Sequence, residues 1–412
     1  MAVSTKDRDT LRHLADKVAL IGALPQQRET IKHWKALNGL RPVRPMVTID
    51  QVCWNEMDVD GELELHCETD FTRGIEQGLR RRIYAWRHMP VDMVVDPWVE
   101  IPKVIRSDGY GITVDERVAV LDPTNDVVGH LYNDQLKTEA DAMRIRPPHV
   151  SLDREATARS EETAREIFDG VLPVHMQGVF PAFNAWDHIT TWRGAQNVLM
   201  DLVDRPELSH LVISRYADAA LAELDQLEAQ GLLGRDMGLV HCTGAFSDEL
   251  PADGYDADRP RARDLWTFGM AQIFGSVSPA MHEEFDIQYA RRWYARFGLG
   301  YYGCCEPLHR KIGIIRSLPR VRKISMSPWV DQEAGARAIG KDFVFSRKPS
   351  PAFLALDTWD PKAVEKDLRS TKEICERYGC PLELVLKDIS TVRYQPQRLW
   401  EWAVIAMRVV RT

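Results

Sequence analysis

Residues 276–308, SVSPAMHEEFDIQYARRWYARFGLGYYGCCEPL, combine a helix with a buried strand that follows it directly. Ser278 is suited to cap the helix and Pro279 to occupy its first position, so we expect a helix over 281–297. The apolar run LGYYGCC (299–305) then predicts a strand that ends in two adjacent cysteines. A helix that leads into a buried strand is the repeating unit of α/β folds.

Seven further stretches of the chain have the pattern of buried strands: RPMVTID (44–50), VDMVVDP (91–97), LPVHMQG (172–178), GLVHCTG (238–244), VRKISMSP (321–328), KDFVFSRKP (341–349) and LELVLKDIS (382–390). Helical patterns lie between them, as over 207–230 and 361–378. Eight strands alternating with helices predict an α/β fold, a single (β/α)8 barrel. A doubly wound open sheet would need a glycine-rich phosphate loop after an early strand, and the sequence has none.

The expected organisation is an N-terminal helical arm over residues 1–40 and a barrel over 41–412. The spacing of the strands is uneven, so we expect insertions at about 51–90 and 98–171 on the C-terminal face of the barrel. Function in such barrels collects at that face, where the loops after the strands meet.

The composition is that of an ordinary globular protein with a negative net charge. The 412 residues are 44% hydrophobic and carry a net charge of −8, which argues against nucleic-acid and anionic membrane partners. No apolar run approaches the roughly 20 residues of a membrane span. The N-terminus is charged and has no secretory core, so we expect a cytoplasmic protein. Seven cysteines in such a compartment are expected to be thiols, metal ligands or nucleophiles.

Polar and aromatic side chains stand at the predicted strand ends, which makes them the candidate site. Carboxylates and a lysine there suit acid–base catalysis: Asp50, Glu306, Lys387 and Asp388. Tryptophans, an amide and a guanidinium suit an aromatic-lined pocket that binds an organic substrate: Trp54, Trp98, Gln177, Trp329 and Arg347. Singly, each of these residues is equally compatible with a solvated or paired strand end; Lys387 and Asp388 also suit a simple ion pair.

The segment SVSPAMHEEFDIQYARRWYARFGLGYYGCCEPL resembles the uroporphyrinogen decarboxylase superfamily, in which a similar helix leads into a strand with a His-x-Cys motif. HMQGVFPAF (175–183) resembles the turn after the third strand of that family. The resemblance implies a (β/α)8 barrel. It covers roughly residues 30–410 and is specific only in this middle region. The superfamily contains decarboxylases and zinc-dependent methyltransferases that act on a corrinoid protein or a thiol.

Two departures from the family pattern restrict the function. DQVCWNEMDVDGELEL follows the first strand where the decarboxylases have an arginine-rich segment, and an acidic segment would repel a tetra-acidic porphyrinogen. We therefore expect no uroporphyrinogen decarboxylase activity. Of the methyltransferase zinc motif, Cys305 matches the cysteine, Gly303 stands in place of the histidine, and Ser346 falls near the second cysteine.

A zinc site would therefore need ligands from neighbouring residues. The candidates are Cys305, Cys242, His241 and His309, with Glu306 as a further donor. If 238–244 and 299–305 are adjacent strands, their ends lie about 4.8 Å apart and both could reach one ion. Neighbours on a strand face opposite ways, so we expect Cys305 to face the site and Cys304 to pack, unless the strand has already ended. These residues equally suit a buried structural cluster or a metal-free acid–base site.

The leading interpretation is a methyltransferase that moves a methyl group between a small organic substrate and a corrinoid protein or a thiol, with zinc as Lewis acid. One alternative is a lyase or decarboxylase of a small acid, with Asp50, Glu100 or Asp388 as proton donor. A second alternative is a non-enzymatic binding protein on a barrel scaffold. The family resemblance implies a homodimer.

Overall fold

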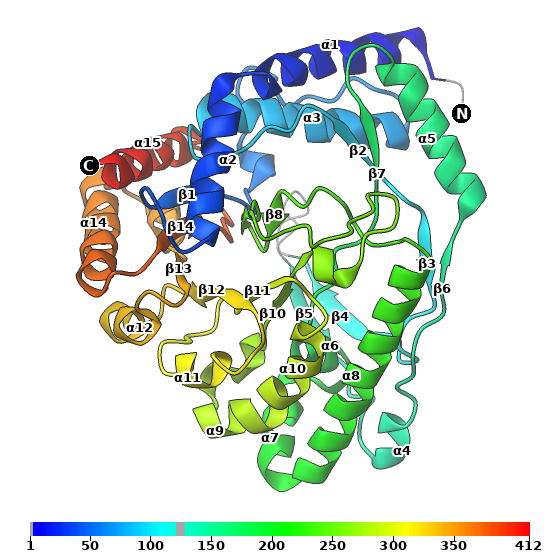
Figure 1. The fold of residues 1–412 in the computed structure, drawn as a ribbon, viewed down its shortest axis with the longest axis vertical. Coiled ribbons are helices and arrows are strands. Elements are labelled where there is room, and N and C mark those ends of the chain that lie inside the picture. The colour runs from blue at the N-terminus through cyan, green and yellow to red at the C-terminus, as the bar shows by residue number, and fades with distance from the viewer. Residues whose placement is uncertain (1–2, 121–127) are drawn as a thin grey trace.

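The computed structural model describes residues 3–120 and 128–412, and its centre is a parallel sheet of six strands. The strands in spatial order are β1 (Met46–Ile49), β14 (Leu382–Leu386), β13 (Val344–Arg347), β12 (Val321–Met326), β11 (Leu299–Tyr302) and β10 (Trp266–Gly269). The first strand therefore pairs with the last, and the sheet curls through an arc (Figure 1). Parallel strands buried on both faces read as nearly continuous apolar runs, which is the pattern of these sequences.

A second parallel pair lies in the same ring of elements. It consists of β2 (Val99–Pro102) and β7 (Val174–Gln177). One bridge joins the segment after β7 to β10, at Phe183 and Gly269. On the other side Asp92 donates its backbone N–H to the Val47 oxygen of β1 at 3.0 Å. The structure thus shows a curled, six-stranded half-barrel with an associated pair of strands; a closed eight-stranded barrel is not shown.

Two of the predicted strands were wrong. Residues 91–97 lie beside β1 but form no strand. Residues 238–244 form an antiparallel hairpin of β8 (Leu239–Val240) and β9 (Thr243–Gly244), because His241 and Cys242 have positive φ angles of 41° and 69° and reverse the chain. Residues 238–244 were expected to lie beside β11. Strand β10, which the sequence did not predict, occupies that position.

Helices cover the outer side of the sheet and flank the second pair of strands (Figure 1). The longer ones are α1 (Thr5–Gly22), α2 (Pro25–Asn38), α3 (Asp70–His88), α5 (Arg154–Phe168), α6 (Ala185–Arg193), α7 (Ala195–Asp204), α8 (Pro206–Ala229), α12 (Gln332–Ile339), α14 (Pro361–Tyr378) and α15 (Gln397–Arg411). Helix α14 has the predicted bounds, because the Asp360 side chain accepts from the N–H of Lys362 and Ala363 and Gly379 ends it at φ 70°. No helix in the described part of the chain is long and apolar enough to cross a membrane.

The helix predicted over 281–297 is interrupted and ends early. It consists of α9 (Pro279–His282), a π-helical turn (Glu283–Ile287) and α10 (Gln288–Tyr294). In the π-helical turn, Asp286 is buried and accepts a hydrogen bond of 2.7 Å from Tyr302 of β11. This contact locks the interrupted helix to the outer side of the strand that leads to the two cysteines.

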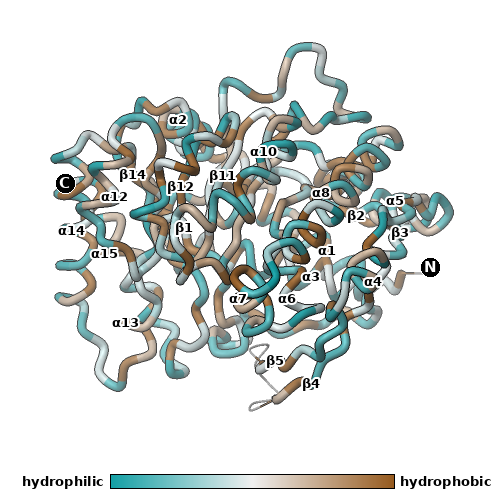
Figure 2. The backbone as a smooth tube through the Cα atoms, turned by 90° about the horizontal axis from the view of Figure 1, so that it is seen from below, coloured by the Kyte–Doolittle hydropathy of each residue, from teal (hydrophilic) through white to brown (hydrophobic). Residues whose placement is uncertain are grey.

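The expected insertion at 98–171 contains two short antiparallel ladders, β3 (Ile105–Ser107) with β6 (Val150–Leu152) and β4 (Glu116–Ala119) with β5 (Gly129–Tyr132). The β4–β5 ladder is exposed and projects from the body of the molecule (Figure 2). Residues 121–127 of this insertion, and residues 1 and 2 of the expected N-terminal arm, lie outside the described residues.

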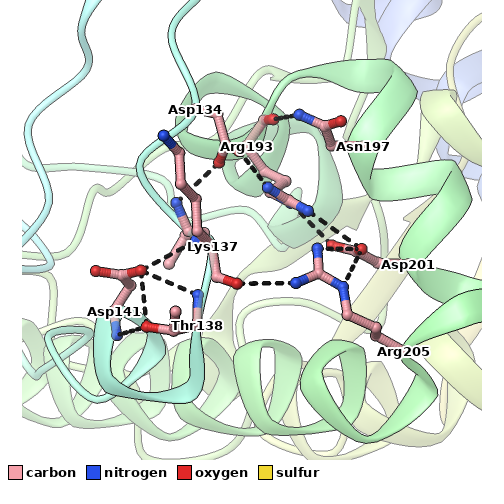
Figure 3. Close-up of polar contacts among 9 residues, drawn as sticks. Asp134, Lys137, Thr138, Asp141, Arg193, Asn197, Asp201 and Arg205 are labelled. Carbon is pink, nitrogen blue, oxygen red and sulfur yellow. Dashed lines mark hydrogen bonds and ion pairs between the residues drawn. The ribbon is translucent and has the colours of Figure 1, made fainter.

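A partly buried ion network connects the insertion to α6 and α7 (Figure 3). Arg193 at the end of α6 donates to Asp201 of α7 at 2.8 Å and also pairs with Asp134 of the insertion. Arg205 donates to the same Asp201 and, at 2.8 Å, to the backbone oxygen of Lys137. The insertion is therefore tied to the helices by charge-assisted hydrogen bonds, which are the stronger kind.

Candidate functional site

The β8–β9 hairpin lies in the middle of the ring of strands (Figure 1) and is held there by hydrogen bonds to the sheet. Thr48 of β1 donates to the Cys242 oxygen at 2.9 Å, and Thr243 donates to Glu383 of β14 at 2.7 Å. The Lys323 ammonium of β12 donates to the Gly244 oxygen at 3.0 Å. The turn at His241–Cys242 is thereby fixed near the ends of β11 and β14.

The anchor of the hairpin is a fully buried ion pair. Lys323 and Glu383 lie 2.7 Å apart with both side chains entirely buried. The Lys323 ammonium also lies 5.1 Å from the ring centre of Trp34 and 5.7 Å from that of Trp266. Burial lowers the pKa of Lys323, and the neighbouring carboxylate opposes that effect. A buried pair of this kind is costly to break, so it fixes position.

Two cysteine thiols and a lysine meet where β11 and β14 end. Strand β11 ends at Tyr302, and Gly303 turns the chain with φ 94°. As a result the Cys304 and Cys305 sulfurs lie on the same side, 3.5 Å apart. The Lys387 Nζ is 3.3 Å from Cys304 Sγ and 3.8 Å from Cys305 Sγ. The alternation expected along a strand does not apply beyond Tyr302.

Gly303 cannot be replaced by the family histidine without rearrangement. A Cβ on this residue would lie 2.3 Å from Leu308 Cδ1 and 3.1 Å from the Cβ of Ser325. Its positive φ is also unfavourable for any residue with a side chain. The departure from the His-x-Cys pattern at this position is therefore built into the backbone of the site.

Asp388 completes the thiol cluster, which consists of Cys304, Cys305, Lys387 and Asp388. Its Oδ2 accepts from Lys387 at 2.7 Å and lies 3.2 Å from the Cys305 sulfur. Cys304 is 5% exposed, whereas Cys305 and Asp388 are partly open to solvent. The expected proximity of Lys387 and Asp388 is thus a direct ion pair that also contacts both sulfurs.

The two thiols have opposite protonation tendencies. The hydrogen bond from Cys305 lowers the pKa of Cys304, and the neighbouring His241 and Lys387 lower it further, against the opposing effect of burial. The same hydrogen bond and burial raise the pKa of Cys305. The charges around the pair raise the pKa of Lys387 despite burial. The arrangement therefore favours a thiolate on Cys304, a thiol on Cys305 and an ammonium on Lys387.

A second lysine lies beside this cluster, directly after β13. Lys348 is fully buried, donates to Ser346 Oγ at 2.9 Å and contacts the Tyr301 hydroxyl, which is itself 2.9 Å from Ser346. Burial lowers the pKa of Lys348 to about 8. The His241 ring stacks on Phe268 at 4.7 Å and lies 5.1 Å from the Tyr301 ring. The predicted strand ends did not point to Tyr301 or Ser346, because both lie within strands.

Glu306 supports the loop that carries the thiols. Its Oε2 accepts the backbone N–H of Cys304 at 2.8 Å, and the side chain is 2% exposed. Within the described structure its Oε1 has no hydrogen-bond partner. Burial raises the pKa of Glu306 to about 7. Asp50, also expected to be catalytic, lies near Cys242. Burial and the Asp50 carboxylate raise the pKa of the Cys242 thiol.

The residues expected to bind zinc do not form a zinc site in this arrangement. His309 lies beside Arg310 and Asp331, and Cys242 faces Asp50. Over the described ranges, no group of three or more His, Cys, Asp or Glu side chains is placed to hold a metal ion. Lys387 places a positive charge against both sulfurs of Cys304 and Cys305, where a zinc ion would have to approach. The donor set therefore does not fit zinc.

The three tryptophans do not line a common pocket, so that expectation was wrong. Trp54 lines a cavity of about 820 Å³ together with Asp388. Trp98 stacks on the His175 ring at 4.8 Å and borders a different cavity. Trp329 is 75% exposed. Each of the three tryptophans follows a strand or an expected strand in the sequence, but the loops that carry them run in different directions.

The other expected substrate-binding residues have partners within the protein. Gln177 donates to Glu100 at 3.3 Å and to the Arg235 oxygen at 3.0 Å. Arg347 is buried and donates to the backbone oxygens of Ser327 and Lys348 at 2.7 and 2.9 Å. Arg347 thus holds the backbone just after β12 and β13, and Gln177 holds the loop over 231–236, which precedes β8.

A second cavity, of about 410 Å³, lies between β1, the segment 91–97 and the hairpin. Asp50, Asp96, Glu100 and Cys242 are among its lining residues. Burial raises the pKa of Asp96 to about 7, with the nearby Glu100 and Asp236 carboxylates adding to the effect. Sequence reasoning placed Asp96 at a strand end, but only its burial shows that it can hold a proton near neutral pH.

Comparison with family models and with curated proteins found no match. Among solved structures, a methyltransferase from Methanosarcina mazei aligns with 92% of this chain and 98% of its own, at 10% sequence identity and a TM-score of 0.47.

Proposed function

We propose that this protein is an enzyme that transfers a methyl group through a cysteine thiolate, with Cys304 as the nucleophile. The observation that carries the proposal is the Lys387 ammonium 3.3 Å from the Cys304 sulfur, inside a nearly closed site. A thiolate is the nucleophilic form of cysteine, and a neighbouring cation favours it. Methyl as the transferred group is the choice favoured by the resemblance to the methyltransferases.

In the first half-reaction the Cys304 thiolate attacks the methyl carbon of an activated donor, such as a sulfonium or a quaternary ammonium compound. A carbon–sulfur bond forms, the bond from carbon to the donor heteroatom breaks, and its electron pair leaves with the now neutral donor. Cys305 supports this step by donating its hydrogen bond to the thiolate, which holds the sulfur in one orientation. The thiolate is converted into a neutral thioether.

In the second half-reaction an acceptor stronger than a thiol removes the methyl group, and the electron pair of the carbon–sulfur bond returns to Cys304. Lys387 favours this step because its ammonium stabilises the thiolate that leaves. A reduced corrinoid carried by a partner protein has the required nucleophilicity. No step uses zinc, because the donor set does not fit that metal.

The approach route in this proposal is the cavity of about 820 Å³ that Asp388 and Trp54 line. Asp388 contacts the Cys305 thiol at 3.2 Å, so this cavity borders the thiol cluster. The Arg81 guanidinium lies 5.0 Å from the Trp54 ring centre at its wall. The volume falls within the range of small-molecule sites.

The test is direct detection of the methylated thiol. The reduced full-length protein is incubated separately with an S-methyl sulfonium, a tetraalkylammonium carrying a methyl group, and methylcobalamin, each labelled in the methyl group. We expect peptide mass spectrometry to find Cys304 heavier by the labelled methyl group with at least one donor. Addition of reduced cobalamin should then remove the label.

Three variants separate this chemistry from general alkylation. Cys304→Ser should not be labelled, Cys305→Ser should be labelled more slowly, and Cys380→Ser, which lies outside the site, should behave as the wild type. Labelling that persists on other cysteines in Cys304→Ser at the wild-type rate would refute the proposal, as would the absence of label with all three donors.

The second candidate function is acid–base catalysis on a small acid in the cavity of about 410 Å³. The specific observation is that burial raises the pKa of Asp96 to about 7, in a cavity that Asp50 and Glu100 also line. Asp96 would donate the proton in a lyase or decarboxylase reaction. Loss of activity toward small carboxylic acids in Asp96→Asn, with full activity in Cys304→Ser, would favour this function over methyl transfer.

A further inference from the structure

We propose that Cys304 and Cys305 form a redox modification site, at which a peroxide closes the two neighbouring thiols to a disulfide. The observations are the 3.5 Å separation of the two sulfurs, the Lys387 ammonium in contact with both, and the partial exposure of Cys305. The inference rests on the proposed function in one respect only: the disulfide would switch off the nucleophile that the function requires.

The structure places the two sulfurs in van der Waals contact, 3.5 Å apart. A disulfide needs about 2.05 Å between sulfurs, so the sulfurs must approach by roughly 1.5 Å. Side-chain rotation at Cys305, whose side chain is partly open to solvent, can supply most of this movement. Gly303 ends β11 before the pair, so the movement does not disturb a strand hydrogen bond of β11.

The surroundings distinguish this pair from thiols that merely fill the core. In the core pair Cys375 and Cys380, the hydrogen bond between the two thiols raises the pKa of Cys375 and lowers that of Cys380. At Cys304 the hydrogen bond from Cys305 acts in the same way, and an imidazole and a lysine lower the pKa further. Oxidation of cysteine follows thiolate character and access, and a neighbouring thiol then resolves the oxidised form.

The reaction is balanced with a peroxide as oxidant. The Cys304 thiolate attacks one peroxide oxygen, the sulfur–oxygen bond forms, the oxygen–oxygen bond breaks, and the released hydroxide takes a proton from solvent. The Cys305 sulfur then attacks the Cys304 sulfur: the sulfur–sulfur bond forms, the sulfur–oxygen bond of the Cys304 sulfenic acid breaks, and its oxygen leaves as water with the Cys305 proton. Two thiols and one hydrogen peroxide give one disulfide and two waters.

The disulfide should be readily reversible. Neighbouring Cα atoms lie about 3.8 Å apart across a trans peptide, shorter than the roughly 4.4–6.8 Å that ordinary disulfides span. The resulting strain makes the bond easier to reduce. The expected device is therefore a reversible block of Cys304, released by a small dithiol, and not a permanent structural crosslink.

The test oxidises the reduced full-length protein with a small molar excess of hydrogen peroxide, blocks free thiols with N-ethylmaleimide and maps peptides by mass spectrometry. We expect the peptide that contains both Cys304 and Cys305 to lose two hydrogens and to escape blocking. Dithiothreitol should reverse the change. In Cys305→Ser, Cys304 should instead stop at a sulfenic acid that dimedone traps.

Two comparisons make the result specific. The buried Cys375 and Cys380 thiols in the same sample serve as an internal control and should remain reduced at this dose. Lys387→Met should slow the oxidation of Cys304 by about tenfold or more, because less thiolate is present at neutral pH. Direct conversion of Cys304 to a sulfinic acid in the wild type, or pairing of Cys304 with Cys242, would overturn the proposal.

The outcomes for the two proposals are separable. Disulfide formation without methyl labelling of Cys304 supports the redox site and refutes the function. Methyl labelling without disulfide formation supports the function and refutes the redox site. If both occur, peroxide should suppress labelling and dithiothreitol should restore it.

Discussion

Replacement of Lys387 by methionine is the most direct test of the electrostatics of the thiol cluster. Methionine keeps most of the side-chain volume and removes the charge, which lies 3.3 Å from the Cys304 sulfur. With an effective dielectric constant of about 20, a charge pair at this distance is worth roughly 5 kcal/mol. Relaxation of the site reduces that value, so we expect the pKa of Cys304 to rise by about 2 to 4.

The assay is the rate at which iodoacetamide alkylates Cys304 as a function of pH, followed by peptide mass spectrometry. In the wild type the thiolate is already formed near neutral pH, so the rate should be almost independent of pH there. In Lys387→Met the rate should be low at neutral pH and rise with pH as the thiol ionises. Circular dichroism and thermal unfolding should show that the variant keeps its fold.

Asp388→Asn is the matched control, with an effect of opposite sign. It removes the negative charge that contacts both Lys387 and Cys305, and this charge disfavours a thiolate nearby. In Asp388→Asn the alkylation rate should therefore rise at the same pH as in the wild type or at a lower pH. If the profiles of Lys387→Met and the wild type coincide, Lys387 does not stabilise the thiolate and the mechanistic argument is wrong.

Three further predictions concern the framework of the site. Lys323→Met leaves the Glu383 carboxylate buried without its cation and should lower the free energy of unfolding by about 3–5 kcal/mol. Adding Glu383→Leu should recover most of this loss. The prediction is wrong if urea unfolding finds the double variant no more stable than Lys323→Met. Gly303→Ala should destabilise by about 2–4 kcal/mol through the positive φ and the contact with Leu308, and a change below about 0.5 kcal/mol would show that the loop adapts. Burial raises the pKa of Glu306 to about 7, above its unfolded value, so its contribution to stability is full below the unfolded value and is lost as pH rises through about 7; urea unfolding across pH should show this loss in the wild type and not in Glu306→Gln.

Much of the sheet could be predicted from the sequence because its strands are short, apolar and bounded by turns or caps. Strands β1, β7, β11, β12, β13 and β14 lie within predicted stretches. The error at 238–244 has a physical cause: Leu239–Val240 and Thr243–Gly244 have strand-like composition, but the chain reverses at His241–Cys242 without the Asn-Gly or Asp-Gly signal of a tight hairpin. Strand β10 (WTFG) was missed although it is as long as β1, β11 and β13.

The site was predictable to the extent that the ends of parallel strands meet. Cys305, Lys387 and Asp388 were chosen for that reason, and the structure brings them together. The position of Cys304 in the thiol cluster could not be predicted, because it depends on β11 ending at Tyr302, one residue before the turn at Gly303. The approach of His241 to Cys304 depends on a hairpin that enters from a distant part of the chain.

The pairing of the first strand with the last has a consequence for the order of folding. Thr48 of β1 holds the hairpin across 194 residues, and Glu383 holds it across 140. The second contact needs β14, which pairs with β1. Such distant contacts are slow to form, because a long loop must close before they stabilise anything. On the ribosome, β14 emerges after β10 to β13, so a growing chain can build these earlier strands while the centre stays unassembled. The contacts around Cys304 should therefore be complete only after β14 has emerged.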